Sequence, residues 1–527
     1  MSHARRSGFR WIVLAGLVAP LVLHSSAHAG GFERTSPGAR ANGRAGADHV
    51  GGDSPMSLMY NPANILVGSG LFRIEGALHL HFSERCMQRN EVNEDPGTGE
   101  RTAGTVHPNV CSEGGASVIP QLAASLRVLD KLAIGFGVYV PPAASRVMHF
   151  GDPETGRYDP DGQGGDDPVL TPTRYLLIEQ ELLQAFLTTG VAYQPHERFR
   201  IGATFGWGFT KVDYASASFS RTPITVSGIR LLEAESDVHT ALEALDAFVP
   251  RIQLGAWGQP IRDLPLEFGA SFHWTQNVKT SNGTLNVRTL ETRLPAWAQA
   301  LVTEPIEAEG TIEGVRLEAP QISTLNFGVR YAKKLTSPAD NIGDRLSTER
   351  FDIELDVIAA FHSRVQQFTV TPPPGAGLDV APPEIPLLEV DPIRVNLPEQ
   401  IALQKQWRSQ VHVRLGSDVS VIPGVLALRA GVSYESRGVK SGYENLDFQP
   451  LTQVGLHMGG TVRLWNRLDL SVAYAHIFQP AVTVGIDEAQ YRRTVAGDPD
   501  PGDDTIVNAG RFTGRSDILI VQAGASF

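Results

Sequence analysis

Residues 266–274 read LEFGASFHW, and apolar side chains alternate there with polar or small ones. A period of two places the apolar side chains on one face of an extended chain, so this stretch predicts a β-strand. The same alternation recurs in residues 199–209, 351–357, 426–434 and 454–464. We therefore expect an all-β protein built from many strands of this kind.

The alternation fits two architectures. In a soluble sandwich the apolar face packs inward and the polar face meets water. In a transmembrane β-barrel the apolar face meets lipid and the polar face lines the lumen. Large aromatic residues gather toward one end of their strands, which is typical of the interfacial girdles of membrane barrels. These residues are Trp207, Phe209, Trp274, Tyr434, Tyr474 and Phe478.

The connections between strands favour the membrane barrel. Short turns at residues 130–131, 194–197 and 465–467, with somewhat longer ones at 258–264 and 417–424, alternate with long polar connections. Short periplasmic turns alternating with long extracellular loops are typical of an outer-membrane barrel. The pattern predicts an antiparallel barrel of about 14 strands with both termini in the periplasm. The long connections are residues 83–116, 151–173, 219–247, 279–317, 371–402, 438–449 and 485–511.

The first 29 residues have the features of a secretory signal. Arg5, Arg6 and Arg10 supply positive charge, residues 11–23 form an apolar core, and Ala27-His28-Ala29 is a small-x-small cleavage site. We expect cleavage after Ala29, because the apolar core is short for a transmembrane anchor, which is the alternative. The formal net charge of −12 argues against nucleic acid as a partner.

Cys86 and Cys111 are the only cysteines of the 527 residues. Both lie in one long polar connection, and an exported chain meets an oxidising compartment. We expect them to form a disulfide. A metal site or a catalytic thiol is the less favoured alternative.

Residues 30–63 are rich in glycine and alanine and end in the corner Asn61-Pro62-Ala63. Glycine and alanine side chains are too small to form a hydrophobic core of their own, so this stretch is expected to pack inside a larger structure. Pro62 restricts both itself and Asn61, so the corner is rigid. The chain ends in a strand that places Phe527 on its apolar face, after VNAGRF at residues 507–512.

This combination resembles the FadL-type family of outer-membrane long-chain fatty acid transporters, which includes aromatic-hydrocarbon channels. The segments LRAGVSY (428–434) and LSVAYAH (470–476) add to the resemblance, whereas residues 371–398 and 448–450 depart from it. The resemblance implies an N-terminal hatch, residues 30–70, that plugs the lumen of a barrel formed by residues 71–527.

The resemblance also implies a function. Members of this family capture hydrophobic ligand with extracellular loops and release it sideways into the bilayer through a gap at a kinked third strand. We therefore expect uptake of long-chain fatty acids or similar hydrophobic compounds by a monomer in the bacterial outer membrane. The expected partners are that ligand, outer-membrane lipids and the barrel-assembly machinery, which reads C-terminal aromatic residues such as Phe527. No cofactor is expected.

Two apolar stretches inside polar connections are candidates for ligand capture. One is residues 294–302, with Trp297 and Leu301. The other is residues 231–248, whose apolar residues recur at helical spacing. The alternative is that the two stretches pack on each other and cap the barrel mouth. The apolar residues of the second stretch are Leu231, Leu232, Val238, Leu242, Leu245 and Phe248.

Pro141 and Pro142 are the candidates for the gap. Proline cannot donate a hydrogen bond to a neighbouring strand, so two in succession predict a local opening in the third strand. The alternative is that the strand ends at Val140. We further expect the Asn61-Pro62-Ala63 corner to contact the barrel wall near this gap and to take part in gating.

Four arginines are expected to face the lumen, and they fit two roles. They could bind a carboxylate head group, or, as we favour, neutralise the lumen's own carboxylates. The arginines are Arg73, Arg414, Arg429 and Arg463, and the carboxylates are Glu75, Asp352, Glu354 and Asp356.

Other functions are less well supported. His79 and His81 share one strand face, but two histidines without a third ligand are more often structural than a metal site. No nucleophile motif or phosphate-binding loop stands out, so no enzyme is expected. The rival functions are a diffusion porin for polar solutes and a lipid hydrolase carried on a barrel.

Overall fold

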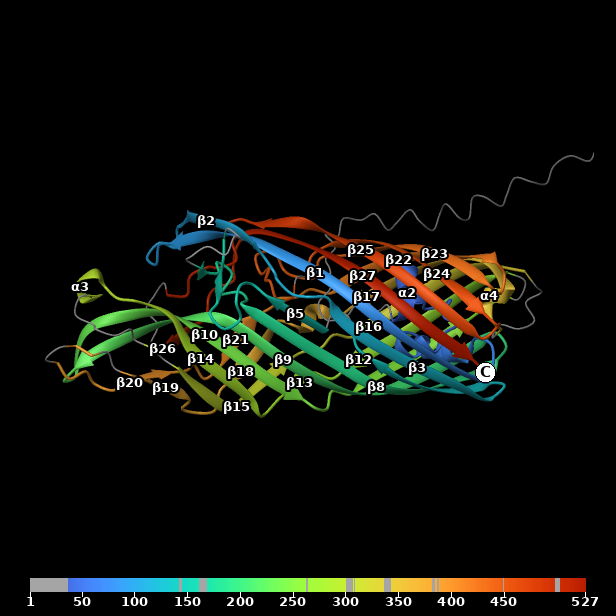
Figure 1. The fold of residues 1–527 in the computed structure, drawn as a ribbon, viewed down its shortest axis with the longest axis horizontal. Helices are drawn as coiled ribbons and strands as arrows, with labels where there is room; N and C mark the ends of the chain where they lie inside the picture. Colours follow the sequence, from blue (N-terminus) through green and yellow to red (C-terminus); the bar gives the residue numbers. More distant parts are fainter. Residues whose placement is uncertain are drawn as a thin grey trace, which may run out of the picture.

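The computed structural model describes residues 37–141, 145–160, 168–261, 264–299, 307, 309–335, 343–381, 384–385, 388–448, 450–497 and 503–527. Within these residues a 14-strand antiparallel sheet closes on itself (Figure 1). In chain order its strands are β1 (Phe72–Glu94), β3 (Ser117–Leu129), β4 (Leu132–Tyr139), β8 (Glu179–His196), β9 (Phe199–Val226), β11 (Arg251–Gly258), β12 (Leu266–Thr275), β16 (Thr324–Lys334), β17 (Glu349–Ala360), β22 (Gln410–Ile422), β23 (Leu426–Glu435), β24 (Gln453–Leu464), β25 (Leu468–Val484) and β27 (Gly510–Ser526).

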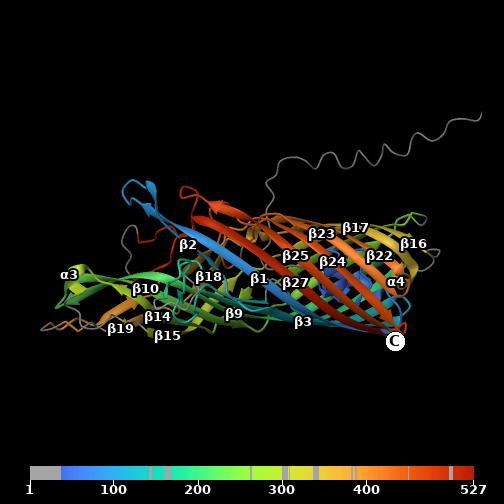
Figure 2. The same cartoon turned by 45° about the horizontal axis from the view of Figure 1, so that its top comes forward.

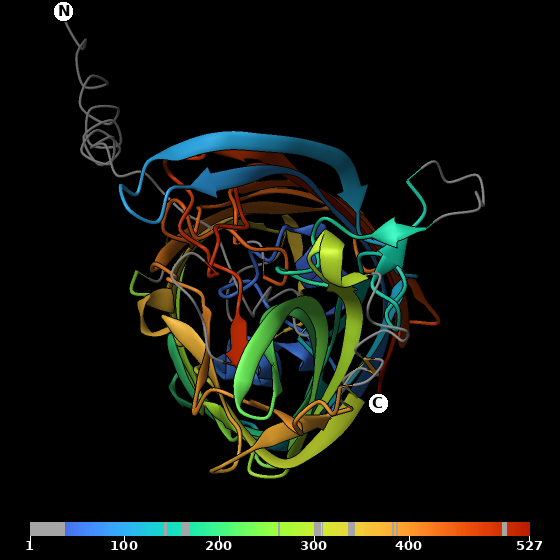
Figure 3. The same cartoon turned by 90° about the vertical axis from the view of Figure 1, so that its left-hand side faces the viewer.

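The closure joins the two ends of the chain. The last strand, β27, pairs antiparallel with β25 on one side and with β1 on the other. The backbone of Leu71 then donates to the carbonyl of the terminal Phe527 at 2.6 Å. Seen from the end, the strands form a ring with N-terminal chain inside it (Figure 3). The predicted barrel is confirmed.

Each strand separates its side chains as the alternation predicts. In β12, Phe268 and Phe272 point outward and are 42% and 38% exposed, whereas Glu267 and His273 point inward and are 2% and 3% exposed. An apolar exterior around a polar interior is the reverse of a soluble sandwich and suits a barrel embedded in lipid. No helix among the described residues is long and apolar enough to cross a membrane.

The two ends of the barrel differ. The short turns lie at the end that carries the C-terminus and α4 (Arg345–Thr348). The connection of residues 335–348 at this end, which includes α4, is longer than the other turns and was not predicted. At the opposite end several strands extend far beyond the ring, up to α3 (Ala296–Gln299) (Figure 2).

The remaining helices and strands are not among the 14 strands of the ring. Most belong to the extended end or continue a barrel strand there, while three short helices lie in the N-terminal segment. The strands are β2 (Arg101–Cys111), β5 (Ser145–His149), β6 (Arg157–Tyr158), β7 (Val169–Leu170), β10 (Ile229–Asp246), β13 (Val278–Lys279), β14 (Gly283–Arg293), β15 (Glu309–Ala319), β18 (Gln367–Thr371), β19 (Gly377–Val380), β20 (Ile393–Asn396), β21 (Ile401–Gln404) and β26 (Val495–Gly497). The helices are α2 (Gly38–Gly43), η1 (Pro55–Met59), η2 (Pro62–Leu66) and η4 (His362–Arg364).

The predicted disulfide is present. Cys86 of β1 and Cys111 of β2 are direct partners in the hairpin register and are bonded through their sulfurs. The bond therefore closes one hairpin at the extended end, beside β27, where Cys86 pairs in register with Thr513.

The helical interpretation of residues 231–248 is wrong. Residues 229–246 form β10, which pairs with β9 and with β14. Leu232, Val238 and Leu242 are buried on one strand face, whereas Leu231 and Leu245 are exposed on the other. The apparent helical spacing came from counting the two faces of one strand together.

A closed barrel of this size resists unfolding by detergent at room temperature, because every edge strand is paired. We therefore expect unboiled and boiled samples of the purified protein to migrate differently on a denaturing gel. The same migration in both samples, together with recovery in the soluble fraction, would contradict a membrane barrel.

Candidate functional site

The N-terminal segment, residues 37–70, packs against inward-facing side chains of the barrel. The backbone N–H of Gly38 donates to Gln121 Oε1 of β3 at 3.1 Å, and that of Ala39 donates to Gln522 Oε1 of β27 at 2.6 Å. Apolar residues of η1 and η2, including Leu58 and Ile65, are buried against the wall. The described N-terminal residues therefore occupy the lumen at the end with short turns (Figure 3).

Arg44 is the centre of a buried ion cluster. Its guanidinium lies 2.8 Å from Asp352 and 3.0 Å from Glu354, both on β17. Arg330 of β16 donates to the same Asp352 at 2.7 Å and lies 3.0 Å from Glu267. Removing one partner of a buried ion pair costs about 3–5 kcal/mol, because the other charge is left uncompensated. This cluster therefore fixes the N-terminal segment to the wall.

A turn next to Arg44 binds the same strand through its backbone. The N–H groups of Val50 and Gly51 donate to the two carboxylate oxygens of Glu354 at 2.7 and 2.9 Å. Nδ1 of His49 lies 2.9 Å from Asp356. Because carboxylates that accept several N–H bonds are well satisfied even when buried, these contacts offset the cost of placing acids in the lumen.

Neighbouring charges shift the pKa values of two side chains in the N-terminal segment, Arg44 and Asp53. Burial opposes charge on Arg44, but the surrounding carboxylates, Asp352 first, outweigh it and hold the pKa of the guanidinium above its usual value. Burial alone would raise the pKa of Asp53, yet Arg40 and other nearby arginines lower it. The ionised Asp53 therefore stabilises the segment at neutral pH, and this contribution is lost as the pH falls through its depressed pKa.

The Asn61-Pro62-Ala63 corner contacts the wall at β9 and β11. Asn61 begins η2: its side chain accepts from Ala63 N at 3.2 Å and donates to the carbonyl of Ala256 at 3.2 Å. A Cβ atom at Gly255 would lie only 2.1 Å from Asn61 Oδ1. The corner therefore requires a glycine at position 255 of the wall. Its contacts are with β9 and β11 and not with the third strand, where we expected them.

The third barrel strand is interrupted beside Pro141. β4 ends at Tyr139, opposite Phe186, and the strand resumes with β5 at Ser145, opposite Leu183. From Tyr139 to Ser145 the chain advances six positions, whereas the partner strand β8 advances only three, from Phe186 to Leu183. Pro142 lies outside the described residues, so the second of the two predicted prolines has no structural account.

The interruption also breaks the ladder between the third strand and β3. Pairing with β3 ends at Leu122 and Val138, and within the described residues no pairing joins β3 to β5. Further along, Glu113 and His149 exchange two backbone hydrogen bonds, of 2.8 and 3.0 Å. Beside the break, Ile119, Val140 and Ala185 form a buried apolar cluster, and Leu183 packs against it.

One polar side chain links this interruption to the N-terminal segment. Gln121 Nε2 donates to the carbonyl of Val140 at 3.3 Å, while Gln121 Oε1 accepts from Gly38 N. The strand interruption is therefore joined to the start of α2, whereas the Asn61 corner contacts β9 and β11, the second and third strands beyond β4.

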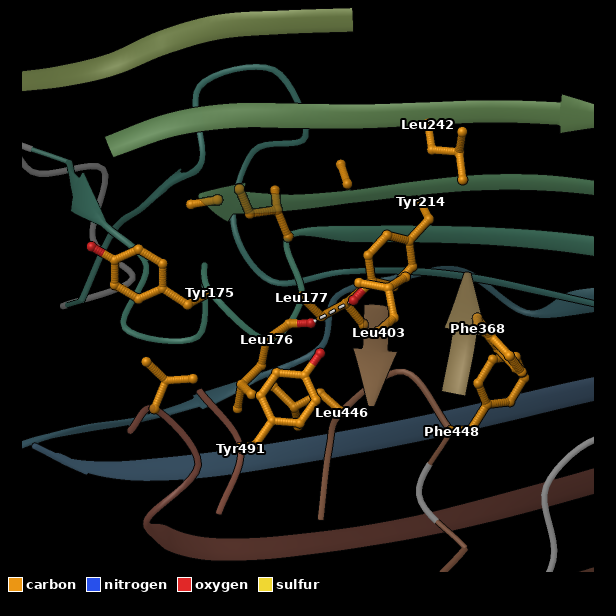
Figure 4. Close-up of a cluster of buried hydrophobic side chains, with 14 of the residues drawn as sticks. Tyr175, Leu176, Leu177, Tyr214, Leu242, Phe368, Leu403, Leu446, Phe448 and Tyr491 are labelled. Carbon is orange, nitrogen blue, oxygen red and sulfur yellow. Dashed lines mark hydrogen bonds between the residues drawn. The ribbon is translucent and has the colours of Figure 1, made fainter. Parts of the chain in front are cut away.

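A large apolar cluster fills the lumen on the side of the long connections. Tyr214 of β9 donates to the carbonyl of Leu176 at 2.9 Å, and Leu242 and Leu403 pack nearby (Figure 4). Around Tyr214 and Leu242 a cavity of about 40 Å³ remains, lined also by Leu285 and Thr494. Further aromatic residues of the cluster are Tyr175, Phe368, Trp407, Phe448, Tyr491 and Phe512.

The candidate capture residues are not brought together. Leu242 belongs to the apolar cluster, but Leu245 and Phe248 point outward, and Phe248 packs on Trp207 with ring centroids 6.2 Å apart. Trp297 on α3 is 60% exposed, and Leu301 lies outside the described residues. Within the part of these stretches that the structure describes, Trp297 and Leu242 line no common groove.

The two stretches nevertheless meet at the tip of the extended end. Ala298 is buried there with Ile224, Leu232 and Val380. This contact corresponds to the alternative that the long connections pack on each other.

Three of the four lumen arginines pair with carboxylates of the protein, but not with the expected ones. Arg73 instead donates to uncharged groups, the carbonyl of Ile65 at 2.5 Å and Ser125 Oγ at 3.0 Å. Arg429 lies 3.2 Å from Asp418. Similarly, Arg463 lies 2.6 Å from Asp469, and Arg414 lies 3.8 Å from Glu435. Of the predicted carboxylates, Asp352 and Glu354 pair with Arg44, Asp356 with His49, and Glu75 accepts from Gln522 at 2.8 Å.

No protein-family model and no curated protein matches the sequence. Solved structures with the same fold include a Pseudomonas aeruginosa FadL homologue, at 13% identity and a TM-score of 0.65, covering 94% of this chain and 100% of that chain. The Pseudomonas putida toluene transporter TodX matches at 13% identity and a TM-score of 0.54, covering 95% and 99%. The Ralstonia pickettii toluene transporter TbuX matches at 13% and 0.51, covering 94% and 99%. The barrel fold implied by the sequence resemblance is confirmed.

A methyl group at Gly255 would collide with the Asn61 corner, and such overpacking costs about 1–3 kcal/mol. We expect Gly255→Ala to lower the temperature at which the unboiled gel band is lost and to expose the N-terminal segment to protease. Gly258→Ala is the matched control in the same strand, because the nearest atom to its Cβ would be 3.6 Å away. Equal behaviour of both variants would show that the corner is not held by β11.

Proposed function

We propose that the protein is an outer-membrane channel for the uptake of long-chain fatty acids or similar hydrophobic compounds, with lateral release at the third strand. The observation that carries this proposal is the interrupted ladder beside Pro141, between the pair Leu122–Val138 and the bridge Glu113–His149, with a buried apolar cluster next to it. Unpaired backbone makes this the weakest place in the wall, and in this proposal the wall opens there toward lipid.

The lumen makes a sideways exit physically reasonable. The described N-terminal residues occupy the lumen at the end with short turns, and the ion cluster of Arg44, Asp352 and Glu354 holds them there. A hydrophobic molecule gains free energy by moving from an apolar cluster into lipid and would lose it by crossing this charged region. An opening at the interrupted ladder would give such a molecule an apolar exit.

Residues 30–70 act in this proposal as a hatch, and residues 71–527 as the barrel, after removal of residues 1–29 as a signal peptide. Residues 1–36 lie outside the described residues, so the start of the hatch rests on the sequence. Gating is assigned to Gln121, which contacts both Gly38 and Val140, with the Asn61-Pro62-Ala63 corner as a fixed support at β9 and β11.

The proposed partners are a fatty acid or another hydrophobic small molecule, outer-membrane lipids, and the barrel-assembly machinery. The protein is proposed to act as a monomer and not as an enzyme. Two solved structures of the same fold are described as toluene transporters and one as a FadL homologue, which is compatible with either kind of hydrophobic ligand.

Mass spectrometry of small molecules retained on the purified protein tests the uptake function. We expect hydrophobic molecules that a washed control barrel lacks. High ion conductance in a planar bilayer with no retained ligand would instead indicate a diffusion porin. Release of fatty acid from a detergent-solubilised ester would indicate a lipid hydrolase.

Replacing Pro141 with Thr and Pro142 with Val restores two backbone donors and favours continuous pairing. We expect uptake of a labelled fatty acid by intact cells to fall several-fold, while the heat-dependent gel shift stays unchanged.

Pro480→Thr is the matched control, because Pro480 also lies in an irregular part of a barrel strand, between the register positions of Gln479 and Val482. Normal uptake by the folded double variant would refute lateral release at the third strand.

A further inference from the structure

A groove of about 770 Å³ lies on the outer face of the barrel wall, across β3, β4, β8 and β9. Large apolar side chains line it, and two of them, Phe136 and Phe205, are 47% and 48% exposed. The space between them remains open because the neighbouring side chains are small, namely those of Ala124, Thr189 and Ala203. Ordinary ligand sites hold roughly 300–1,000 Å³, so the groove is large enough for an alkyl chain.

The groove lies next to the interrupted ladder and on the same face of the wall. Its lining pair Ala124–Phe136 is two register positions from Leu122–Val138, where the ladder between β3 and β4 ends. Side chains two positions apart share a strand face, so both pairs point outward. The groove therefore begins where the wall is weakest.

The apolar cluster at the break contains side chains from both faces of the wall. Ile119 of β3 alternates with Gln121, which points into the lumen and contacts Gly38. Ala185 of β8 instead alternates with the groove residue Thr189 and therefore points outward. An inward and an outward side chain thus belong to one apolar cluster at this place.

The outward face of β8 gives this cluster an apolar side and a charged side. In one direction the face continues through Leu187, which is 52% exposed, to Thr189 in the groove. In the other direction, beyond Leu183, the same face carries Glu181 and Glu179. An alkyl chain at the break gains free energy by moving toward the groove and not toward these carboxylates.

The position of the groove along the strands places it in one half of the bilayer. The groove residues Ile134 and Phe136 come three and five positions after Lys131, which lies in a short turn. With a rise of about 3.4 Å per residue and a tilt of about 40°, they lie about 8–13 Å from that turn. The apolar band of such a barrel is about 25 Å tall, so the groove belongs to the half nearer the short turns.

We propose that this groove receives the alkyl chain of a hydrophobic molecule that leaves the barrel at the interrupted ladder, and directs it into the half of the bilayer next to the short turns. The inference rests on the proposed uptake function. It adds a binding site on the outer wall and a direction of release, which is the periplasmic leaflet in the orientation expected from the loops.

A second groove on the outer face provides a matched comparison. It measures about 550 Å³, and its lining includes Phe268, Ala270 and Phe327. Its strand β12 pairs with β11 and with β16 without a register shift, so no interrupted ladder lies beside it. Membrane lipid meets both grooves, whereas only the first groove adjoins the break.

Photochemical labelling of the full-length protein in phospholipid vesicles tests the site. The probe is hexadecanoate with a diazirine near the end of its chain, and labelled peptides are identified by mass spectrometry. We expect the peptide with Phe136 to be labelled several-fold more than the peptides with Phe268 and Phe327. Ala203→Phe fills the first groove and should remove this excess, whereas Ala270→Phe, the control in the second groove, should leave it unchanged.

The same two variants test the role of the groove in transport. Ala203→Phe should lower the uptake of a labelled fatty acid by intact cells several-fold, because the released chain loses its site on the wall. The hydrophobic molecules retained on the purified protein and the heat-dependent gel shift should not change. Ala270→Phe should take up fatty acid at the wild-type rate.

Four outcomes would overturn the inference while leaving the uptake function intact. They are equal labelling of both grooves by the fatty acid, normal uptake by the folded Ala203→Phe variant, the same preference for the first groove shown by a diazirine-bearing phospholipid, and labelling lost in a crosslinked dimer. The last two would assign the groove to a membrane lipid or to a second copy of the chain. Absence of uptake and of retained ligand in the wild-type protein would count against the uptake function itself and against the inference with it.

Discussion

The inward-facing carboxylates of β17 are the constraint on which the rest of the lumen depends. Asp352, Glu354 and Asp356 lie in a row on one strand face, and water could satisfy them only in an open pore. Here Arg44, Arg330 and the backbone of the turn at residues 48–51 satisfy them instead. The acids of the wall and the N-terminal segment are therefore complementary, and neither is stable without the other.

This complementarity divides the barrel into two chemical compartments. The end with short turns is a charged region in which nearly every ion has a partner within the protein. The end with long connections is an apolar region built around Tyr214 and Leu242. The interrupted ladder beside Val140 is joined through Gln121 to the first residues of α2.

The alternation of apolar and polar residues predicted the barrel, because which face of a strand a side chain occupies depends only on its position along that strand. It also shows why residues 231–248 were misassigned: Leu231 and Leu232 lie on opposite faces of β10, and a search for helical spacing counts both. The cysteine pairing was predictable because both residues lie in one connection. Pro141 was likewise visible in the sequence, since a proline in a strand has a local consequence.

The pairings of the lumen were not predictable. Arg44 and Asp352 are separated by 308 positions, and nothing local tells which of many inward arginines meets which acid. The guanidiniums of Arg89, Arg174 and Arg493, which lie 5.7, 4.6 and 5.5 Å from the centre of the Tyr175 ring, were missed for the same reason, because they come from three distant segments. A partial signal existed in the apolar run of residues 175–178 ahead of a strand, within a connection that is otherwise polar.

The disulfide has a consequence for the order in which the barrel can form. Cys86 and Cys111 are neighbours in a two-stranded hairpin and are only 25 positions apart, so they can meet before any other strand has paired. Oxidation therefore needs no completed ring. The tip of the first strand can be covalently closed before β27, its partner at the seam, pairs with it.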